Sequence, residues 1–308
     1  MDARLVLHPP IGVFMRKIAL VTDSAAAIPE TIGRRLQERG GFVVVPLVVE
    51  IDNNPSHASN DSQLHDSIAL AHALGQKIHT ASPAVNVFER TYRDLLKQGY
   101  EAVLSVHLSA ELSSTYDIAR LAAQNFDGKV FVIDSRTVAM AMGWAVLKAY
   151  ELATSEEDPV QLAEATLEMC ENTQLFFYIP TLEALKRGGR VHPALARVGQ
   201  LMQIRPVVTI EDGKLVYLDR PRTKEGAQES LATRANDEMR RRTSGEFLAE
   251  HKLTPTASGT LKAAHYCGNR PELIHFLAKH NQKTDIISPL PAALSAHTGL
   301  GALALVIY

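Results

Sequence analysis

The sequence predicts a two-domain α/β protein, in which an N-terminal α/β/α sandwich with a mostly parallel sheet precedes a C-terminal α+β domain with a mixed or antiparallel sheet. Short apolar runs alternate with helix-like segments in the first half, as in parallel sheets with helices on both faces. The second half contains a hairpin turn, Glu211–Lys214, between two strand-like runs, which is typical of an antiparallel pair. A chain of 308 residues is also long enough to bury two cores.

The first half begins with an apolar strand, Ile18–Thr22, and a segment with helical spacing, Ile28–Arg39. The run Phe42–Val49 is rich in β-branched residues, which predicts one strand buried on both faces. The polar stretch Asn53–Asp61 is expected to be a loop. One apolar stripe predicts a helix over Val85–Leu96. The remaining elements expected here are the strands Ala102–His107 and Val130–Ile133 and the helices Ser114–Phe126 and Thr137–Ala153.

A domain boundary is expected near Thr154–Pro159, where Ser, Glu and Asp cluster, or after the following helix near Asn172. With the second choice, the N-terminal domain covers 16–172 and the C-terminal domain covers 173–308. Residues 1–15 are expected to be an N-terminal overhang. The elements expected in the second half are the strands Leu175–Ile179, Val207–Ile210, Leu215–Arg220, Leu261–Tyr266, Asp285–Ser288 and Ala302–Tyr308 and the helices Thr223–Arg242 and Pro271–His280.

Composition excludes several classes of protein. The formal net charge is −2, whereas nucleic-acid binders usually carry a basic excess or stripe. No apolar run approaches the roughly 20 residues that a membrane-spanning helix needs. The two cysteines, Cys170 and Cys267, are far apart in apolar surroundings, which indicates reduced thiols and a cytoplasmic protein.

Polar residues, most of them with a hydroxyl group, follow nearly every strand expected in the first half. They are Thr22, Asp23 and Ser24, then Ser109 with Ser113, Ser114 and Thr115, and then Asp134 with Ser135, while Thr80 and Ser82 precede the helix expected at Val85. Ligands of open α/β sheets bind outside the carboxyl ends of the strands. Hydroxyls and helix N-termini there can hold an anion without transforming it, so the pattern predicts a carrier of a small acidic head group.

Each hydroxyl taken alone is equally typical of ordinary local structure. Ser113 is placed to cap the helix that follows it, and Thr80 and Ser82 precede Pro83, which suits a first helical turn. Asp23 and Ser24 form a common turn pair. The anion-binding interpretation therefore depends on the set and not on one member.

Two further segments are candidates for recognition. Lys186–Arg190 places two glycines among three cations, which fits either a loop that recognises phosphate or an acidic partner or a helix C-cap. Arg220–Thr223 could add cations beside it. His297 and Thr298 are expected to lie in a glycine-rich turn before the last strand and could meet the head group from the second domain. The sequence carries no metal-binding, Walker, dinucleotide or serine-hydrolase motif, so no catalytic residue, metal or cofactor is predicted.

Taken in order, these segments resemble the DegV family of fatty-acid-binding proteins, which includes the carrier subunit of bacterial fatty acid kinase. The likeness extends from about Lys17 to Tyr308. The motifs that carry it are Val21–Ser24 with Ile28-Pro29, Thr80–Pro83, Leu108–Tyr116, Val132–Ser135, Leu185–Arg190, Ile204–Pro206 with Glu211–Gly213, Arg220–Lys224 and Ala296–Ala302.

The resemblance implies that one long-chain fatty acid lies between the two domains. Its chain would occupy an apolar tunnel in the first domain, and the second domain would close the head-group site. By the same likeness, Thr80 and Ser113 would bind the carboxylate, with help from Ser114, His297 and Thr298. Ser114 stands where the family usually has glycine, which alters the approach of the backbone to the head group.

The resemblance also implies a partner. Arg190 and Arg222 would face a kinase subunit that phosphorylates the bound carboxylate, while the carrier itself would perform no turnover and need no cofactor. Transient contact with a membrane surface is compatible with this expectation. Asp23, Ser24 and Ser82 are secondary candidates for the head-group site.

Two alternatives stay open from the sequence. One is an acyl- or phosphoryl-transferring enzyme that uses Asp23, Ser113 or His297. The other is an interaction module in which the basic loop around Arg190 matters and the pocket does not.

Overall fold

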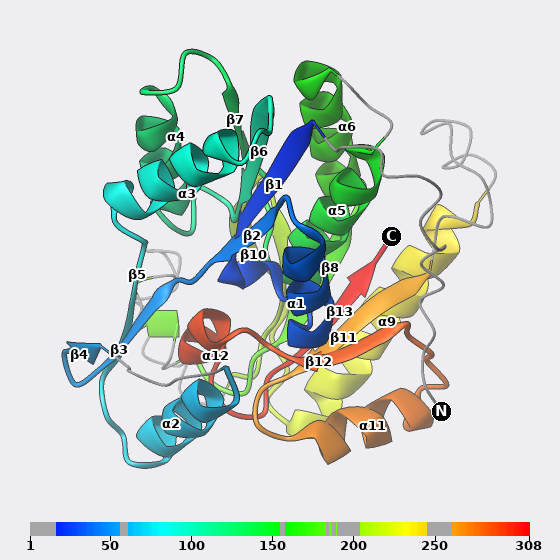
Figure 1. The fold of residues 1–308 in the computed structure, drawn as a ribbon. Coiled ribbons are helices and arrows are strands. Elements are labelled where there is room, and N and C mark those ends of the chain that lie inside the picture. Colours follow the sequence, from blue (N-terminus) through cyan, green and yellow to red (C-terminus); the bar gives the residue numbers. More distant parts are fainter. Residues whose placement is uncertain are drawn as a thin grey trace.

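The computed structural model describes residues 17–55, 61–154, 158–182, 185–186, 189, 204–244 and 260–308. Within these ranges the strands form three sheets, here called A, B and C (Figure 1). Sheets A and C are the two sheets that the sequence predicts, and sheet B is a small addition that it does not. The proposed domain limits, 16–172 and 173–308, stay a prediction.

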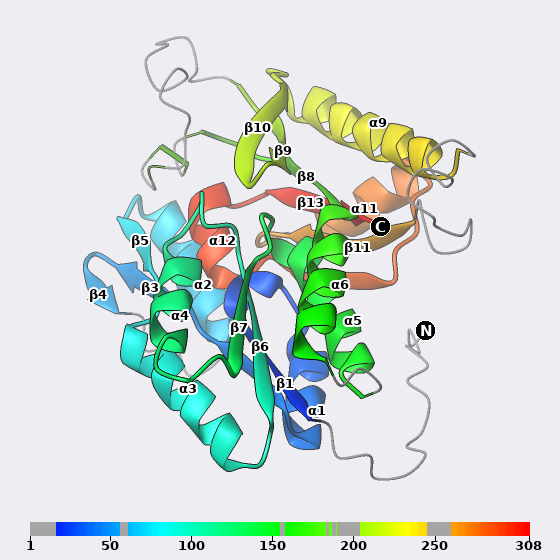
Figure 2. The same ribbon diagram turned by 90° about the horizontal axis from the view of Figure 1, so that it is seen from above.

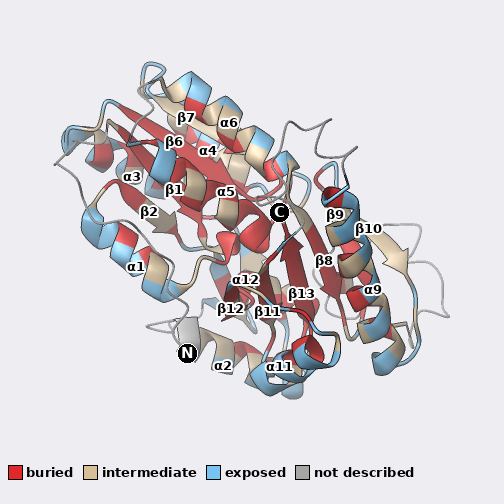
Figure 3. Ribbon diagram, turned by 90° about the vertical axis from the view of Figure 1, so that its right-hand side faces the viewer, coloured by how far each residue is buried: buried red, intermediate tan, exposed pale blue. Residues whose placement is uncertain are grey.

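Sheet A is parallel throughout, as expected for the first half. Its strands, in order across the sheet, are β2 (Phe42–Val45), β1 (Ile18–Asp23), β6 (Ala102–His107) and β7 (Val130–Asp134). Helices cover both faces: α3 (Val85–Lys97) and α4 (Thr115–Ala123) on one, and α1 (Glu30–Arg39), α5 (Ala139–Leu152) and α6 (Pro159–Glu171) on the other. Strands β1 and β6 are therefore buried along their whole length (Figure 3).

The expected strand Phe42–Val49 is wrong as a single element, because it divides between two sheets. β2 pairs with β1 as far as Val45, and β3 (Val48–Ile51) instead joins sheet B, whose order is β4 (Asn54–Pro55), β3 and β5 (Ile78–Ala81). Pro46 lies at the break, and a proline cannot donate a hydrogen bond to a ladder. The expected loop Asn53–Asp61 likewise contains β4 and the first residue of α2 (Asp61–Ala73).

Sheet C is mixed, in agreement with the sequence prediction. Its strands, in order, are β10 (Lys214–Asp219), β9 (Val207–Glu211), β8 (Gln174–Tyr178), β13 (Leu303–Ile307), β11 (Leu261–Tyr266) and β12 (Ile286–Pro289). Only the β11–β12 pair is parallel among its described ladders. At the β9–β10 turn, Asp212 and Gly213 have φ of 49° and 79°, the left-handed conformation that a tight hairpin requires.

Helices α9 (Lys224–Arg242) and α11 (Arg270–Lys279) cover the outer face of sheet C. The opposite face packs against α5, so that α5 lies between sheets A and C (Figure 2). A short helix, α12 (Ala292–Thr298), leaves sheet C and packs against α2 and sheet B. α12 also contacts the 3-10 helix Ser24–Ala26, which follows the carboxyl end of β1.

Candidate functional site

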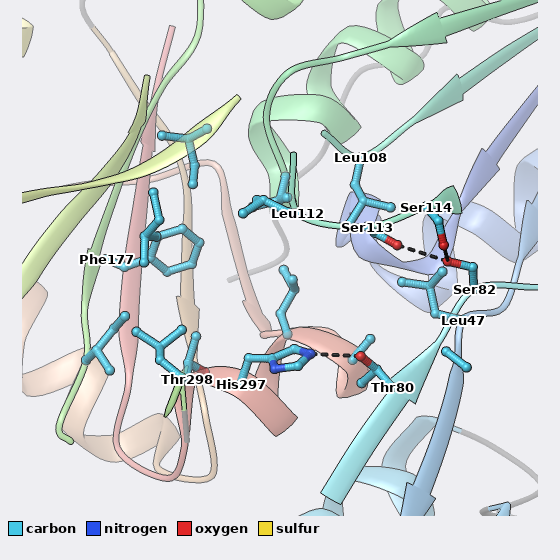
Figure 4. Close-up of a pocket in the computed structure, with 18 residues that line it drawn as sticks. Leu47, Thr80, Ser82, Leu108, Leu112, Ser113, Ser114, Phe177, His297 and Thr298 are labelled. Atoms are coloured by element: carbon cyan, nitrogen blue, oxygen red, sulfur yellow. Dashed lines mark hydrogen bonds between the residues drawn. The ribbon is translucent and has the colours of Figure 1, made fainter. Parts of the chain in front are cut away.

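A cavity of about 290 Å³ lies where the three sheets meet. That volume is close to the lower end of the range for small-molecule pockets, roughly 300–1,000 Å³. The candidate residues Thr80, Ser82, Ser113, Ser114, His297 and Thr298 all line it. The fold therefore brings together three segments that are far apart in the sequence, and Figure 4 shows the hydroxyls of Thr80, Ser82, Ser113 and Ser114 on one side of the cavity.

Four side chains form a hydroxyl cluster on this side, namely Ser82, Ser113, Ser114 and Thr115. Ser82 Oγ lies 3.1 Å from Ser113 Oγ and 3.0 Å from Ser114 Oγ. Thr115 Oγ1 donates to Ser82 Oγ at 3.1 Å and lies 2.9 Å from Ser113 Oγ. The sequence analysis includes Thr115 in the set of hydroxyl residues but does not select it as a head-group ligand, and Thr115 supports the cluster without lining the cavity.

A second polar pair lies beside the cluster. Thr80 Oγ1 and His297 Nε2 are 2.8 Å apart and come from β5 and α12. Thr298 follows His297 and is buried, and its Oγ1 has no hydrogen-bond partner among the described residues. A buried hydroxyl without a partner is costly, so Thr298 is suited to a polar group of a ligand.

Two local expectations need correction. Thr80 does not open a helix, because it lies in β5 and Ala84 is the N-cap of α3. His297 and Thr298 do not lie in the glycine-rich turn; they form the end of helix α12. For Ser113 the capping interpretation and the pocket are compatible, since its Oγ accepts the N–H of Thr115 at 3.3 Å while lining the cavity.

The rest of the cavity wall is apolar. Phe177 belongs to β8 and Ile179 follows it, while Ile210 and Leu215 come from β9 and β10. Figure 4 shows Phe177 across the cavity from the hydroxyls. The apolar wall is completed by Leu47, Ala81, Leu108, Leu112, Val138, Leu185, Ala293 and Leu294. Sheet C therefore supplies much of the surface of this cavity, and the expectation that the acyl chain lies in the first domain stays a prediction.

The described lining of the cavity contains no lysine or arginine side chain. Among its described lining residues, His297 is the only ionisable one. The amino end of α4 lies at the hydroxyl cluster, and the partial positive charge of a helix N-terminus favours an anion. Neutral hydroxyl donors together with a helix terminus can satisfy a carboxylate, so the geometry fits an apolar molecule with one acidic end.

Asp23 and Ser24 do not line the cavity. Asp23 is fully buried and its Oδ2 lies 2.9 Å from Nδ1 of His107. Ser24 Oγ accepts the backbone N–H of Leu47 at 3.0 Å. The enzyme alternative required Asp23 to react with the ligand. Because Asp23 does not line the cavity, it cannot contact a ligand there.

Arg222 is exposed and lies two residues before α9. Arg190 lies outside the described residues.

In the described segments no helix is both long and apolar enough to cross a bilayer, and no group of three or more His, Cys, Asp or Glu side chains is placed to hold a metal ion.

The fold and cavity define a two-domain α/β protein with an internal pocket that is apolar on one side and lined with hydroxyls on the other. The chain belongs to the DegV family, because the family model described as "Uncharacterised protein, DegV family" matches residues 17–308.

Relatives match along almost the whole chain. A DegV domain-containing protein of Streptomyces coelicolor is 31% identical over 295 residues, which cover 95% of this chain and 98% of the relative. The solved structure described as fatty acid binding of a DegV family protein from Thermus thermophilus has a TM-score of 0.77 at 26% identity and covers 95% of this chain and 99% of that one. DegV from Bacillus subtilis, with a TM-score of 0.76, 23% identity and coverage of 94% and 98%, supports the fold.

Proposed function

We propose that this protein binds a single long-chain fatty acid in the cavity, with the carboxylate at the hydroxyl cluster and the Thr80–His297 pair. The observation that carries the proposal is the gathering of hydroxyls on one side of an otherwise apolar cavity. The Thermus thermophilus neighbour, described as binding fatty acid, supports it.

The energetics of such a ligand agree with this division of the cavity. Burying about fifteen methylenes at about 0.8 kcal/mol each contributes roughly 12 kcal/mol. Lost translational freedom and ordering take several kcal/mol of that, and tight binding remains. The apolar wall thus supplies affinity, and the hydroxyls need only satisfy and orient the head group.

Mass spectrometry of the purified protein under non-denaturing conditions tests this proposal. We expect a co-purifying fatty acid, its loss on delipidation, and recovery of a one-to-one complex when a long-chain fatty acid is added back. A preparation that neither retains nor accepts a fatty acid would contradict the proposal.

Removing one head-group hydroxyl should weaken binding without unfolding the protein. Ser113→Ala and Thr80→Ala each remove one or two hydrogen bonds worth about 1 kcal/mol net apiece, so we expect roughly fivefold to thirtyfold weaker fatty acid binding from each and little change in stability. Titration with a fluorescent fatty acid measures the effect. Thr91→Ala is the matched control, because its hydroxyl donates to Val87 O on α3. If both pocket variants bind as well as the parent, the assignment of the head group is wrong.

We further propose that the protein is a non-catalytic, cytoplasmic carrier without a cofactor, which presents the carboxylate to a kinase subunit for conversion to an acyl phosphate. Arg190 and Arg222 would then contact the kinase or the new phosphate, since arginine recognises phosphate with paired donors. The buried, unpaired thiols of Cys170 and Cys267 support a reducing compartment.

Loss of either arginine should separate binding from transfer. For Arg190→Ala and Arg222→Ala we expect unchanged fatty acid binding and at least about tenfold slower phosphorylation by a fatty acid kinase with ATP, because rim charges act mainly on partner association. Arg39→Ala, an exposed arginine at the end of α1, is the control. Phosphorylation at the parent rate in both variants would refute these roles.

A further inference from the structure

A chain of four fully buried polar side chains lies behind the cavity. Asp23 Oδ2 is 2.9 Å from His107 Nδ1, His107 Nε2 is 2.7 Å from Ser105 Oγ, and Ser105 Oγ is 2.9 Å from Tyr92 Oη. The first three have the connectivity of a Ser-His-Asp triad. Ser105 is fully buried, however, and its Oγ is engaged by both neighbours, so no ligand can reach it.

The hydrogen bonds among these four side chains can be assigned in one consistent direction. Burial raises the pKa of Tyr92, so its hydroxyl stays protonated and can donate to Ser105. Ser105 can then donate to Nε2 of His107, which leaves Nδ1–H to donate to Asp23. This assignment gives every proton an acceptor, and it ends on the carboxylate of Asp23.

The same carboxylate holds the loop that leads to the hydroxyl cluster. Asp23 Oδ2 accepts the backbone N–H of Leu108 at 3.1 Å, and its Oδ1 accepts the N–H of Ala25 at 2.9 Å, so it ties the ends of β1 and β6 together. Leu108 lines the cavity. The next residue, Ser109, accepts the N–H of Ser113 through its carbonyl at 3.1 Å. The position of Ser113 therefore follows from that of Asp23.

The neighbouring residue, Ser24, acts in a similar way on the other polar pair. Its Oγ accepts the N–H of Leu47, which immediately precedes β3. Two residues further on, Val49 pairs with Thr80 across the β3–β5 ladder. Asp23 and Ser24 are adjacent, yet one is linked to the hydroxyl cluster and the other to the strand that carries Thr80.

We propose that Asp23 and Ser24 are positioning residues for the head-group site, which fix Ser113 and Thr80 relative to each other without touching the ligand. This inference rests on the proposed binding of a fatty acid. It gives a role to two candidates that lie outside the cavity, and it makes the accuracy of the hydroxyl arrangement depend on a buried carboxylate.

The test compares two ligands that differ only at the head. Dissociation constants for hexadecanoic acid and hexadecan-1-ol are measured with the parent, Asp23→Asn and Ser24→Ala. We expect Asp23→Asn to weaken acid binding about tenfold, in line with the loss of hydrogen bonds to a charged group, and to change alcohol binding much less. Ser24→Ala should raise the ratio of the dissociation constant for the acid to that for the alcohol by about threefold. This variant decides the question if Asp23→Asn does not fold.

His265→Ala is the matched control. His265 is also fully buried, and its Nδ1 lies at hydrogen-bond distance, 3.0 Å, from Ser288 Oγ, but it does not line the cavity. It should lower stability and leave the ratio of the two dissociation constants unchanged. If the parent binds neither ligand, the proposed function fails. If the parent binds the acid but the folded variants keep the parent ratio, whether both affinities fall together or not, the positioning role is refuted.

Discussion

Leu215→Trp is expected to lose most of the affinity for a long-chain fatty acid while the protein stays folded. Leu215 lines the cavity from β10 and is half-buried, so the indole ring can enter space that the acyl chain would occupy. If it excludes about three methylenes, each worth about 0.8 kcal/mol, binding weakens by roughly 60-fold. Titration with a series of acids of decreasing chain length measures the effect, and the shortest acids should be affected least.

Leu218→Trp is the control for this prediction. Leu218 lies on the same strand with similar burial, but it packs against the core between sheet C and its outer helices. The same substitution there should disturb packing and leave the affinity within about threefold, since no methylene of the ligand is displaced. Equal losses from both variants would mean that the acyl chain does not occupy this cavity.

Gly143→Ala should destabilise the protein strongly, although alanine normally improves a helix interior by up to about 1 kcal/mol. A Cβ at Gly143 in α5 would lie 2.1 Å from the backbone oxygen of Ala26 and 2.9 Å from Sδ of Met140. The backbone oxygen belongs to the short 3-10 helix Ser24–Ala26, which cannot move without disturbing the end of β1. We expect a loss of about 3 kcal/mol in the free energy of unfolding, as for severe overpacking, measured by urea denaturation.

Gly33→Ala is the control, and we expect it to raise the free energy of unfolding. Gly33 is buried in α1, but the nearest atom to its added Cβ is Cγ2 of Ile28 at 3.9 Å, an ordinary contact. That variant should gain about 0.5–1 kcal/mol from reduced backbone entropy in the unfolded chain. A Gly143→Ala protein as stable as the parent would show that α5 and the 3-10 helix are not in contact.

Much of the fold could be predicted because local pattern and final environment agree. β6 and β11 have the predicted bounds, since each is a short segment composed mostly of apolar residues, and the central residues of both are buried in a sheet. The error at Phe42–Val49 was avoidable in principle, because Pro46 marks the break. By contrast, α2 has weak amphipathic character, and α12 is short and rich in alanine, so neither gave a periodic signal to detect.

The candidate site was predictable in its residues and not in its arrangement. Hydroxyls after strands indicated a polar crevice, and the fold places Ser113 and Thr80 in the lining of one cavity. Their partners were not accessible to local reasoning. The contact between Thr80 and His297 joins residues 217 positions apart, and the burial of Asp23 depends on His107 from another strand.

The sequence alone determined the α/β class of the chain, the parallel and mixed sheets and the kind of chemistry available at their edges, because hydrophobic periodicity and residue type are local properties. Tertiary structure alone decided that sheet C would provide much of the apolar wall and that α12 would bring His297 to Thr80. It also decided that Asp23 would be buried. Each of these outcomes depends on how segments from distant parts of the chain pack together, and pairing across such distances leaves no signature in neighbouring residues.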